Sequence, residues 1–366
     1  MEISAECLTV DGLSADDRAR WCAWQAADAA RSSPFFRIEF TDAVAAVAPD
    51  VFVLKIWQAG EVVGYWPHQR RGGTLYPVGA PLNDYHGVIG PAATLVSLSL
   101  LVTLANGRRL SANSWVGRAP AGLPLATCQA DLSGISYDEW YGQQSSAFAK
   151  YYKDKARSRR GLEQSLGPVS VRCDVREPQM LDQLIALKRE QYRRTGRHDI
   201  FAACWTRQLL HRLLVQQEDF GASVAALYAG DTLVALELSL HAGSVWHFWF
   251  PAYLPQGARY SAGIWLSLET IRVKRAEGFT EFDYGFVGEP YKKYFCNRTR
   301  EVAEVTVGQP SWVDHVGRVV RNERVLVSAR RRWAAIDASE TGGLGKGRGL
   351  LLAGKSMASR IRTGES

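Results

Sequence analysis

Hydrophobic positions are arranged most regularly in the second half of the chain, from Pro168 onward. Apolar and polar residues there recur with a period of two in some segments and with a helical period in others. The pattern predicts strand 169–173, helices 178–194 and 205–217, strands 222–229, 233–240 and 245–250, helix 261–277, strand 280–286, helix 289–297 and strand 301–307. This order predicts an α/β fold (α+β mixed sheets), with helices on both faces of a mixed sheet.

The first half repeats this order loosely. Helices near Trp21 and Phe40 precede a hairpin with strands 51–57 and 62–67. A helix over 92–106 and strands near 109–116 and 126–131 follow. The residues themselves show no strong repeat, so duplication of one unit is a hypothesis from element order alone.

These patterns predict two domains and two smaller parts. The chain of 366 residues exceeds the size at which one hydrophobic core usually keeps growing. We expect an N-terminal half over 1–140, a linking basic helix over 141–167, a C-terminal half over 168–311 and a basic helix with a tail over 312–366. The linking helix carries Lys150, Lys153, Lys155, Arg157, Arg159 and Arg160. We interpret that run as a solvated helix face, with a site for an anionic ligand as the alternative.

Composition predicts a soluble globular protein in the cytoplasm. The chain is 46% hydrophobic and 22% charged, with no secretory signal at its start and no apolar run long enough to cross a bilayer. Six cysteines lie far apart without a CxxC pair, which argues against a disulfide framework and a zinc site. The seven histidines show no HExxH or His-x-His spacing, so we expect no metal.

Positive charge is concentrated at the C-terminal end. Residues 312–366 contain 11 Lys and Arg against 5 Asp and Glu, a net charge of +6, which leaves +1 for residues 1–311. A nearly neutral body argues against nucleic acid as a partner. Residues 313–336 form an amphipathic pattern that fits either anionic lipid or packing against the body, and 341–349 are predicted to be a flexible tail.

The segment from Phe282 to Phe295 is the most informative for chemistry. A short apolar strand brings Asp283 to an edge, Gly285 allows a turn, and a predicted helix then carries Tyr291, Lys292 and Tyr294. Titratable groups therefore gather where a strand ends. Residues of these types at this spacing also line ordinary cores, and that alternative stays open.

The order of elements resembles the Gcn5-related N-acetyltransferase (GNAT) fold. Short motifs over about residues 30–310 are Ser33-Pro34-Phe35-Phe36-Arg37 with Phe40, the loop 81–87, Leu187–Tyr192 with Thr195-Gly196, Tyr260-Ser261-Ala262-Gly263, and Phe282-Asp283-Tyr284-Gly285 with Tyr291-Lys292 and Phe295. These motifs resemble the CelD/BcsL group, whose members have two GNAT-like halves, are similar to the Fem peptidyltransferases and are linked to cellulose or other exopolysaccharide production. Two departures weaken the acyl-CoA assignment: Ala262 stands where the group commonly has proline, and Gln256-Gly257-Ala258-Arg259 meets the phosphate-loop pattern only loosely.

The resemblance implies that acetyl-CoA, or another acyl-CoA, is the co-substrate. Its pyrophosphate would lie at the start of the predicted helix 261–277, where backbone N–H groups are free. The residues expected to bind it are Gly257, Arg259, Tyr260, Ser261, Ala262, Gly263 and Tyr294. The alternative is a simple loop with a capping glycine.

The same resemblance implies a gap between strands 246–250 and 282–284 that holds the thioester. His247 or Asp283 would take a proton from the incoming amine or hydroxyl. Tyr291 or Tyr294 would protonate the leaving thiolate, and Lys292 would hold an anionic group or the thioester oxygen. A histidine that serves only the structure is the alternative for His247.

An acceptor is expected in a cleft between the two halves. The candidate residues pair donors and acceptors with aromatic rings, as sugar hydroxyls require: Asp84, Tyr85, Lys188, Gln191, Tyr192 and Arg197. The same groups could instead seal a domain interface.

Three hypotheses for function follow. The first is an acyl-CoA-dependent N- or O-acetyltransferase that acts on a sugar or glycan precursor in exopolysaccharide (cellulose-type) biosynthesis. The second is a Fem-like aminoacyl transferase, and the third is a non-catalytic GNAT-derived scaffold of a polysaccharide synthase complex. Peripheral contact with the inner face of the plasma membrane through the basic C-terminal helix accompanies the first.

Overall fold

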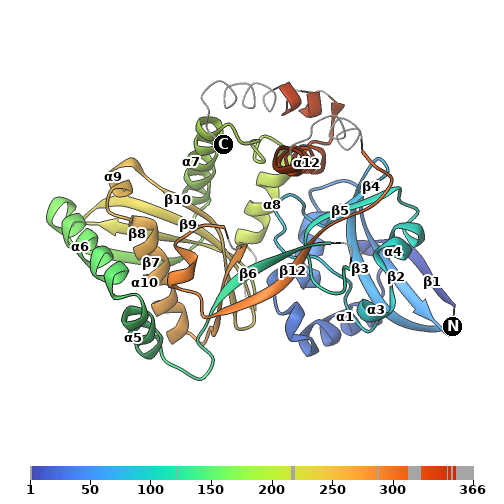
Figure 1. Cartoon of the computed structure of the whole chain (residues 1–366), viewed down its shortest axis with the longest axis horizontal. Helices are drawn as coiled ribbons and strands as arrows, with labels where there is room; N and C mark the ends of the chain where they lie inside the picture. The colour runs from blue at the N-terminus through green and yellow to red at the C-terminus, as the bar shows by residue number, and fades with distance from the viewer. Residues whose placement is uncertain are drawn as a thin grey trace. The chain divides into compact units, whose positions relative to one another are not determined.

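The chain folds into two compact units, each a mixed sheet flanked by helices (Figure 1). The computed structural model describes residues 2–120, 122–215, 219–286, 288–311, 323–343, 345–347 and 349–351. Unit 1 comprises Met1–Pro124, Arg189–Leu209 and Val302–Ser366, and unit 2 comprises Leu125–Lys188 and Leu210–Glu301. The predicted mixed α/β fold is confirmed.

The strands of unit 1 follow the order β1, β2, β3, β4, β5, β12. Their bounds are β1 (Ile3–Thr9), β2 (Val51–Gln58), β3 (Glu61–Arg71), β4 (Thr74–Pro77), β5 (Arg109–Trp115) and β12 (Arg298–Gly308). Only β4 and β5 pair in parallel within this set. The pattern missed β1, because this strand lies beside β2 alone and most of its residues are exposed.

Short helices cover the sheet of unit 1. They are α1 (Ala15–Ala27), α2 (Ile38–Ala45), α3 (Ala92–Leu95), α4 (Leu98–Leu104) and the 3-10 turns η1 (Val10–Gly12), η2 (Ala29–Arg31) and η3 (Pro34–Phe36). The prediction of one helix over 92–106 is wrong. Val96 is extended, and the Ser97 side chain accepts from the backbone N–H of Leu100, so it caps a new helix.

The strands of unit 2 follow the order β6, β11, β10, β9, β8, β7. Their bounds are β6 (Leu123–Asp131), β11 (Glu281–Phe286), β10 (Val245–Tyr253), β9 (Thr232–Ala242), β8 (Phe220–Ala229) and β7 (Val169–Val175). Strands β10 and β11 pair in parallel, and the other neighbours pair antiparallel. The long apolar runs in β8, β9 and β10 are buried almost throughout, which is why they were visible in the sequence.

The helices associated with unit 2 are α5 (Tyr137–Ala147), α6 (Ala149–Leu166), α7 (Pro178–Thr195), α8 (Cys204–Val215), α9 (Pro255–Ala258) and α10 (Ala262–Ala276). One core joins α5, α6 and α10 to the sheet through Trp140, Tyr152, Trp246, Trp265 and Phe282. Both α7 and α8 contribute their later residues to unit 1, since the boundaries fall after Lys188 and Leu209.

The predicted helix over 289–297 is wrong as well. Only one 3-10 turn forms there, η4 (Lys292–Tyr294). The backbone N–H of Asn297 already donates to the carbonyl of Gln129 on β6 at 3.1 Å. Because the chain must join the sheet at that point, no room remains for a longer helix.

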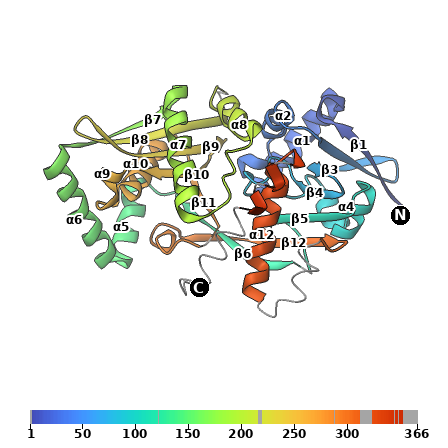
Figure 2. The same cartoon turned by 90° about the horizontal axis from the view of Figure 1, so that it is seen from above.

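The helix α12 (Glu323–Ser339) packs on unit 1 beside β4, β5 and β12 (Figure 2). Ile336 and Ala338 are buried, and the Trp205 indole donates to the carbonyl of Ser339 at 2.8 Å. Residues 313–322 of the predicted amphipathic helix lie outside the described residues. The flexible tail predicted over 341–349 is contradicted where the structure describes it, because residues 343, 345–347 and 349–351 are helical and Lys346 pairs with Asp337.

Candidate active site

Two parallel strands separate in the middle of unit 2. Pairing between β10 and β11 covers Val245–His247 with Glu281–Asp283. Beyond that point β10 follows β9, whereas β11 follows β6. The resulting gap between the strands is the feature expected from the sequence, and it begins at His247 and Asp283.

His247 and Asp283 face each other at the start of this gap. Their side chains are fully buried, and Nδ1 of His247 lies 3.7 Å from Oδ1 of Asp283. That Asp283 oxygen accepts the backbone N–H of Gly285 at 2.7 Å. Gly285 has φ of 65°, a conformation that favours glycine, and it lies in a β-bulge of β11. Asp283 therefore both faces the histidine and holds the turn that ends the strand.

A third buried titratable residue, Glu237, completes this group and was missed in the sequence. Glu237 lies on β9 opposite Pro251 of β10, and it accepts a hydrogen bond from Ser267 of α10 at 3.1 Å. Burial raises the pKa of Glu237 to about 8, although Ser267, Lys188, Lys292 and His247 act in the opposite direction. A carboxyl group with a pKa this close to neutrality can accept or release a proton at physiological pH.

Two lysines predicted for the site have different surroundings. Lys188 is buried in unit 2, where its ammonium donates to the Pro251 carbonyl at 3.3 Å and contributes positive charge near Glu237. Lys292 donates to the carbonyls of Tyr284 and Phe286, each at 2.7 Å, and pairs with Glu289. Because an ammonium has three N–H donors, the Lys292 contacts occupy its donors in closing the turn after β11.

The tyrosines after β11 lie beside the same group. Burial raises the pKa of Tyr291, and the negative charge of Glu237 contributes to the shift, so the phenol stays protonated and can donate a hydrogen bond. Tyr294 stacks on Tyr151 of α6 with ring centroids 3.7 Å apart. Its backbone carbonyl accepts from the Tyr152 hydroxyl at 3.0 Å. The structure therefore places Tyr294 at the contact between η4 and α6.

All the residues predicted to bind acyl-CoA except Tyr294 lie together where α9 ends and α10 begins. Gly257 is packed so tightly that a Cβ atom would lie 2.6 Å from the Val234 carbonyl oxygen. Arg259 is exposed and lies over the ring of Tyr260. Ala262 is buried, whereas open space surrounds the position of a Cβ on Gly263. Close packing at Gly257 thus fixes the position of the turn, and Gly263 leaves open space beside the first residues of α10.

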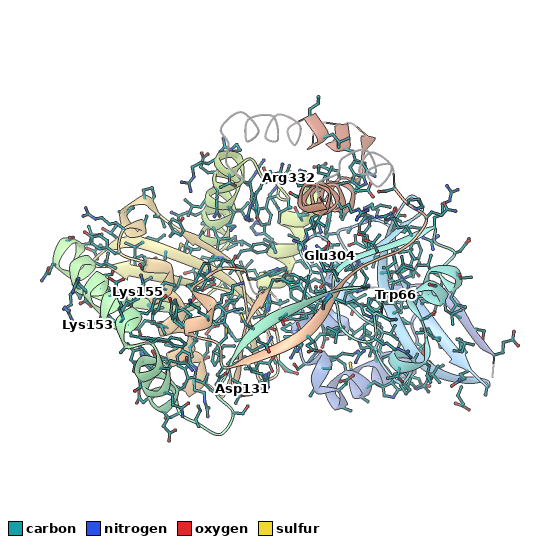
Figure 3. All side chains as sticks on the ribbon, viewed as in Figure 1. Trp66, Asp131, Lys153, Lys155, Glu304 and Arg332 are labelled. Atoms are coloured by element: carbon teal, nitrogen blue, oxygen red, sulfur yellow. The ribbon has the colours of Figure 1, made fainter. Side chains whose placement is uncertain are left out.

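Helix α6 adds a cation to this turn. Lys155, labelled in Figure 3, donates to the Ser261 side chain at 3.0 Å. Ser261 is the N-cap of α10 and has left-handed backbone angles (φ 58°, ψ 39°). The Trp265 indole donates to the Lys155 carbonyl at 3.2 Å, which fixes α6 against α10. The basic helix therefore contributes one of its lysines to the start of α10.

The remaining predicted acceptor residues belong to unit 1. Tyr85 is fully buried and packs near Phe35, so it is a core residue in this structure. Asp84 is half-buried, and its backbone carbonyl accepts from Ser114. Gln191 and Tyr192 are half-buried near the end of α7, and Arg197 is exposed in the loop that follows. Lys188 is thus the one member of the predicted acceptor set within unit 2.

The described residues form no metal-binding cluster and no membrane-spanning helix. Within the described ranges, no three His, Cys, Asp or Glu side chains come together in a way that could hold a metal ion. Likewise, none of the described helices combines the length and apolarity needed to cross a bilayer.

Comparison with known protein families identifies the class of the domain that contains this gap. Residues 149–293, from the start of α6 to η4, match the acetyltransferase (GNAT) domain family. This domain is therefore of the GNAT acyltransferase type, and it contains the separated strands and the buried acid–histidine group. None of the curated proteins compared with the chain matches it.

Among solved structures, FemX shares 9% identity with a TM-score of 0.50, over 83% of this chain and 96% of FemX. A tandem GNAT protein from the clavulanic acid biosynthesis pathway shares 11% identity with a TM-score of 0.48, over 85% and 100% of the two chains. L-PGS from Bacillus licheniformis shares 9% identity with a TM-score of 0.43, over 88% and 97%. The likeness to FemX shows a common fold, and identities this low show nothing further.

Proposed function

We propose that the protein is an acyl-CoA-dependent N- or O-acetyltransferase that acts on a sugar or glycan precursor of an exopolysaccharide of the cellulose type. The observation that carries the proposal is the gap between β10 and β11, with Glu237, His247 and Asp283 buried where the strands separate. The turn before α10 supports acyl-CoA as the donor, because it offers helix N–H groups, Lys155 and open space at Gly263.

The residues suggest how protons move during transfer. His247 or Glu237 accepts the proton of the attacking amine or hydroxyl, directly or through a water molecule. The nucleophile then forms a bond to the thioester carbonyl carbon, and the bond from that carbon to sulfur breaks. Tyr291, kept protonated by burial, donates a hydrogen bond to the leaving thiolate, which takes its proton from solvent. Asp283 favours the protonated form of His247 while that proton is held.

Calorimetry with acetyl-CoA tests the donor. Wild type is expected to bind, and Gly263→Trp is expected to lose binding because the indole would fill the open approach. Gly142→Trp on α5 is the matched control, since open space also surrounds a Cβ there. Absence of binding by a correctly folded wild type would argue for a scaffold without catalytic activity.

A Fem-like aminoacyl transfer is the second candidate, favoured by the fold shared with FemX. The same protein should be incubated with acetyl-CoA and with an aminoacyl-tRNA, in the presence of a glycan precursor. We expect acyl transfer from acetyl-CoA alone. Transfer only from the aminoacyl-tRNA would replace the first proposal with the second.

We also place the protein in the cytoplasm, at the inner face of the plasma membrane near a polysaccharide synthase. The basic stretch 312–366 supports this placement, because a net charge of +6 attracts anionic lipid. Replacing Arg318, Arg321 and Arg324 with glutamate should shift the protein from the membrane fraction to the soluble fraction. An unchanged distribution would remove the lipid contact from the proposal.

A further inference from the structure

Positive charge in unit 2 is concentrated on helix α6. Unit 2 contains eighteen Lys and Arg residues and eighteen Asp and Glu residues, so its formal charge is zero. Helix α6 alone contains six Lys and Arg residues against Asp154 and Glu163, a net charge of +4. The rest of unit 2 is therefore net negative, and α6 is a positive region on a neutral unit.

Four of these cations lie on one exposed face of α6. Lys150, Lys153, Arg157 and Arg160 are exposed, and they follow one another at intervals of three, four and three positions. At about 3.6 residues per turn, they fall within an arc of about 80° and extend along about 15 Å of the helix. These four residues are called the basic face below.

The opposite side of α6 holds the helix against the rest of unit 2. Tyr152 and Leu162 are buried in the core, and Lys155 donates to Ser261 at the start of α10. Figure 3 labels Lys153 on the outer side of α6 and Lys155 on the side toward α10. The basic face is therefore separate from the Lys155 contact that supports the turn before α10.

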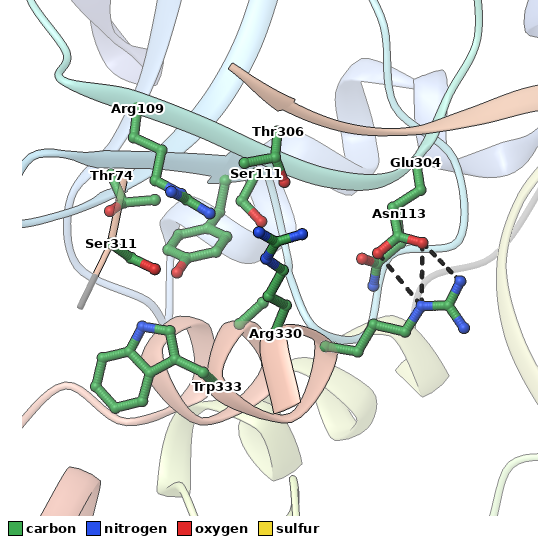
Figure 4. Close-up of a pocket in the computed structure, with 12 residues that line it drawn as sticks. Thr74, Arg109, Ser111, Asn113, Glu304, Thr306, Ser311, Arg330 and Trp333 are labelled. Atoms are coloured by element: carbon green, nitrogen blue, oxygen red, sulfur yellow. Dashed lines mark hydrogen bonds and ion pairs between the residues drawn. The ribbon is translucent and has the colours of Figure 1, made fainter. Parts of the chain in front are cut away.

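The four cations of the basic face form no ion pair or hydrogen bond within the described part of the chain. A paired cation is seen on α12, where Arg331 contacts Glu304 of β12 at 2.6 Å (Figure 4). On α6 itself, Arg159 contacts Glu163 at 3.1 Å and Glu269 of α10 at 2.7 Å. Because no such partner neutralises the basic face, its charges act on whatever lies outside the protein.

Carboxylates on the segments packed against α6 do not cancel this charge. With α6, these segments cover residues 137–147, 149–166, 169–175, 220–231, 254–277 and 288–297. Together they contain thirteen Lys and Arg residues against nine Asp and Glu residues, a net charge of +4. Three of these carboxylates have no cation partner among the described residues: Asp138, Glu139 and Asp231. The excess of positive charge therefore remains when every neighbouring carboxylate is counted.

The form of the basic face favours a lipid surface over a nucleic acid. Proteins that follow a nucleic acid strand combine cations with aromatic rings that stack on the bases. On α6 both tyrosines are turned inward: Tyr151 stacks on Tyr294, and the Tyr152 hydroxyl donates to the Tyr294 carbonyl at 3.0 Å. The remainder of unit 2 has a net charge of −4, so the positive surface does not continue beyond these segments. A row of four cations on a helix suits anionic lipid head groups.

We propose that the basic face of α6 docks unit 2 on the anionic lipid surface of a membrane. The contact is electrostatic, because the face contains no apolar side chain and the opposite side of α6 belongs to the core of unit 2. The proposal goes beyond the proposed function, since it depends neither on the acyl donor nor on the acceptor. It also concerns a different surface from the stretch 312–366.

Cosedimentation of the full chain with vesicles tests the basic face. One set of vesicles contains phosphatidylcholine alone, and the other contains about 30% phosphatidylglycerol as the anionic lipid. We expect binding to the anionic vesicles only, and we expect it to weaken as salt is added, because salt screens exposed charges. Equal binding to both sets, or no binding to the anionic vesicles, overturns the proposal.

A four-site variant separates the basic face from the basic C-terminal stretch, which it keeps intact. Since one cation near an anionic surface contributes about fivefold to binding, the variant should bind anionic vesicles at least about tenfold more weakly. It replaces the whole basic face: Lys150→Gln, Lys153→Gln, Arg157→Gln and Arg160→Gln. Because these side chains have no partner in the described structure, the variant should keep the circular dichroism spectrum of wild type.

A control variant removes the same net charge from exposed arginines on other segments: Arg108→Gln, Arg118→Gln, Arg194→Gln and Arg212→Gln. It should weaken vesicle binding by less than about threefold, since charges farther from the lipid are screened. An equal loss in both four-site variants overturns the proposal, because net charge alone would then explain the binding.

Two further measurements separate this proposal from the alternatives. If transfer RNA binds more tightly than anionic vesicles in fluorescence anisotropy, and only the basic-face variant loses it, the partner is a nucleic acid and the lipid proposal is overturned. Acetyl-CoA affinity in calorimetry should be the same in wild type and both four-site variants. If wild type binds anionic vesicles through α6 but does not bind acetyl-CoA, this proposal stands and the choice of donor fails.

Discussion

Replacement of Glu237 with glutamine should change how the stability of the protein depends on pH. Glu237 is 4% exposed and is surrounded by β9, β10 and α10. Glutamine has nearly the same shape and can still accept the Ser267 hydrogen bond, but it cannot ionise. The substitution therefore removes the titration with little change in packing.

The magnitude follows from the shifted pKa. Burial raises the pKa of Glu237 from 4.5 to about 8. Between these values the folded chain retains a proton that the unfolded chain has lost, so folding stability decreases as pH rises. The slope is about 1.4 kcal/mol per pH unit, and the whole effect is on the order of 5 kcal/mol, fully lost once the pH exceeds about 8. Below pH 4.5, the pKa of Glu237 in the unfolded chain, the full stabilisation is present.

Urea unfolding at pH 5.5, 6.5 and 7.5 measures this effect. Other titrating groups are common to both proteins, so they cancel when the free energy of unfolding of wild type is subtracted from that of Glu237→Gln. This difference should move by about 2 to 3 kcal/mol in favour of the variant between pH 5.5 and 7.5. Glu190→Gln on the exposed side of α7 is the control and should show no such movement.

A difference that stays constant across this pH range would refute the argument, because it would mean that Glu237 is already ionised when folded. The same titration predicts catalysis. If Glu237 is the base, the rate rises toward pH 8 in wild type, and this rise is absent in Glu237→Gln. If His247 is the base, the variant retains activity and His247→Ala loses it.

Three further predictions concern the turn before α10 and buried ions. Gly257→Ala should weaken acetyl-CoA binding in calorimetry, because the new methyl group would meet the Val234 carbonyl at 2.6 Å and displace the turn. Asp17→Asn should lower the free energy of unfolding in urea by about 2 to 3 kcal/mol at pH 7, since it leaves Lys55 without its carboxylate partner. Burial alone would raise the pKa of Asp17, but its hydrogen bonds outweigh burial and lower the pKa. The loss of stability in Asp17→Asn should therefore shrink as the pH falls below 3.8. Lys274 of α10 is buried, lies over the Trp246 ring and pairs with Glu277. Lys274→Ala should cost about 2 to 3 kcal/mol in the same assay, whereas Lys274→Met, which refills the space, should cost less than about 1 kcal/mol.

The strands of unit 2 could be predicted because nearly all of their residues are buried. Residues 233–240 and 245–250 are apolar almost throughout, and the structure buries nearly all of them. The helix predicted over 289–297 could not be corrected from the sequence, since its spacing fits a helix equally well. The deciding contact is the hydrogen bond from Asn297 to Gln129, 168 positions away in the chain.

Glu237 is visible in the sequence, but the hydrophobic pattern did not mark it as a candidate site residue. A glutamate flanked by Leu236 and Leu238 interrupts an otherwise apolar run, and a buried carboxyl group is rarely accidental. Strand alternation alone places it on a face, and only the packing of α10 shows that Ser267 meets it there. An acidic residue within an apolar strand should therefore have been counted as a candidate.

Tyr85 and Tyr192 were both predicted to contact the acceptor because of their residue type, but the structure gives them different surroundings. Tyr85 has no exposed surface, whereas Tyr192 is half-buried and lines a pocket beside α12. The difference arises from neighbours distant in sequence: Phe35 lies near Tyr85, and α12 leaves one side of Tyr192 open. Residue type can nominate a sugar-binding ring, but only the surrounding fold decides whether a ligand can reach it.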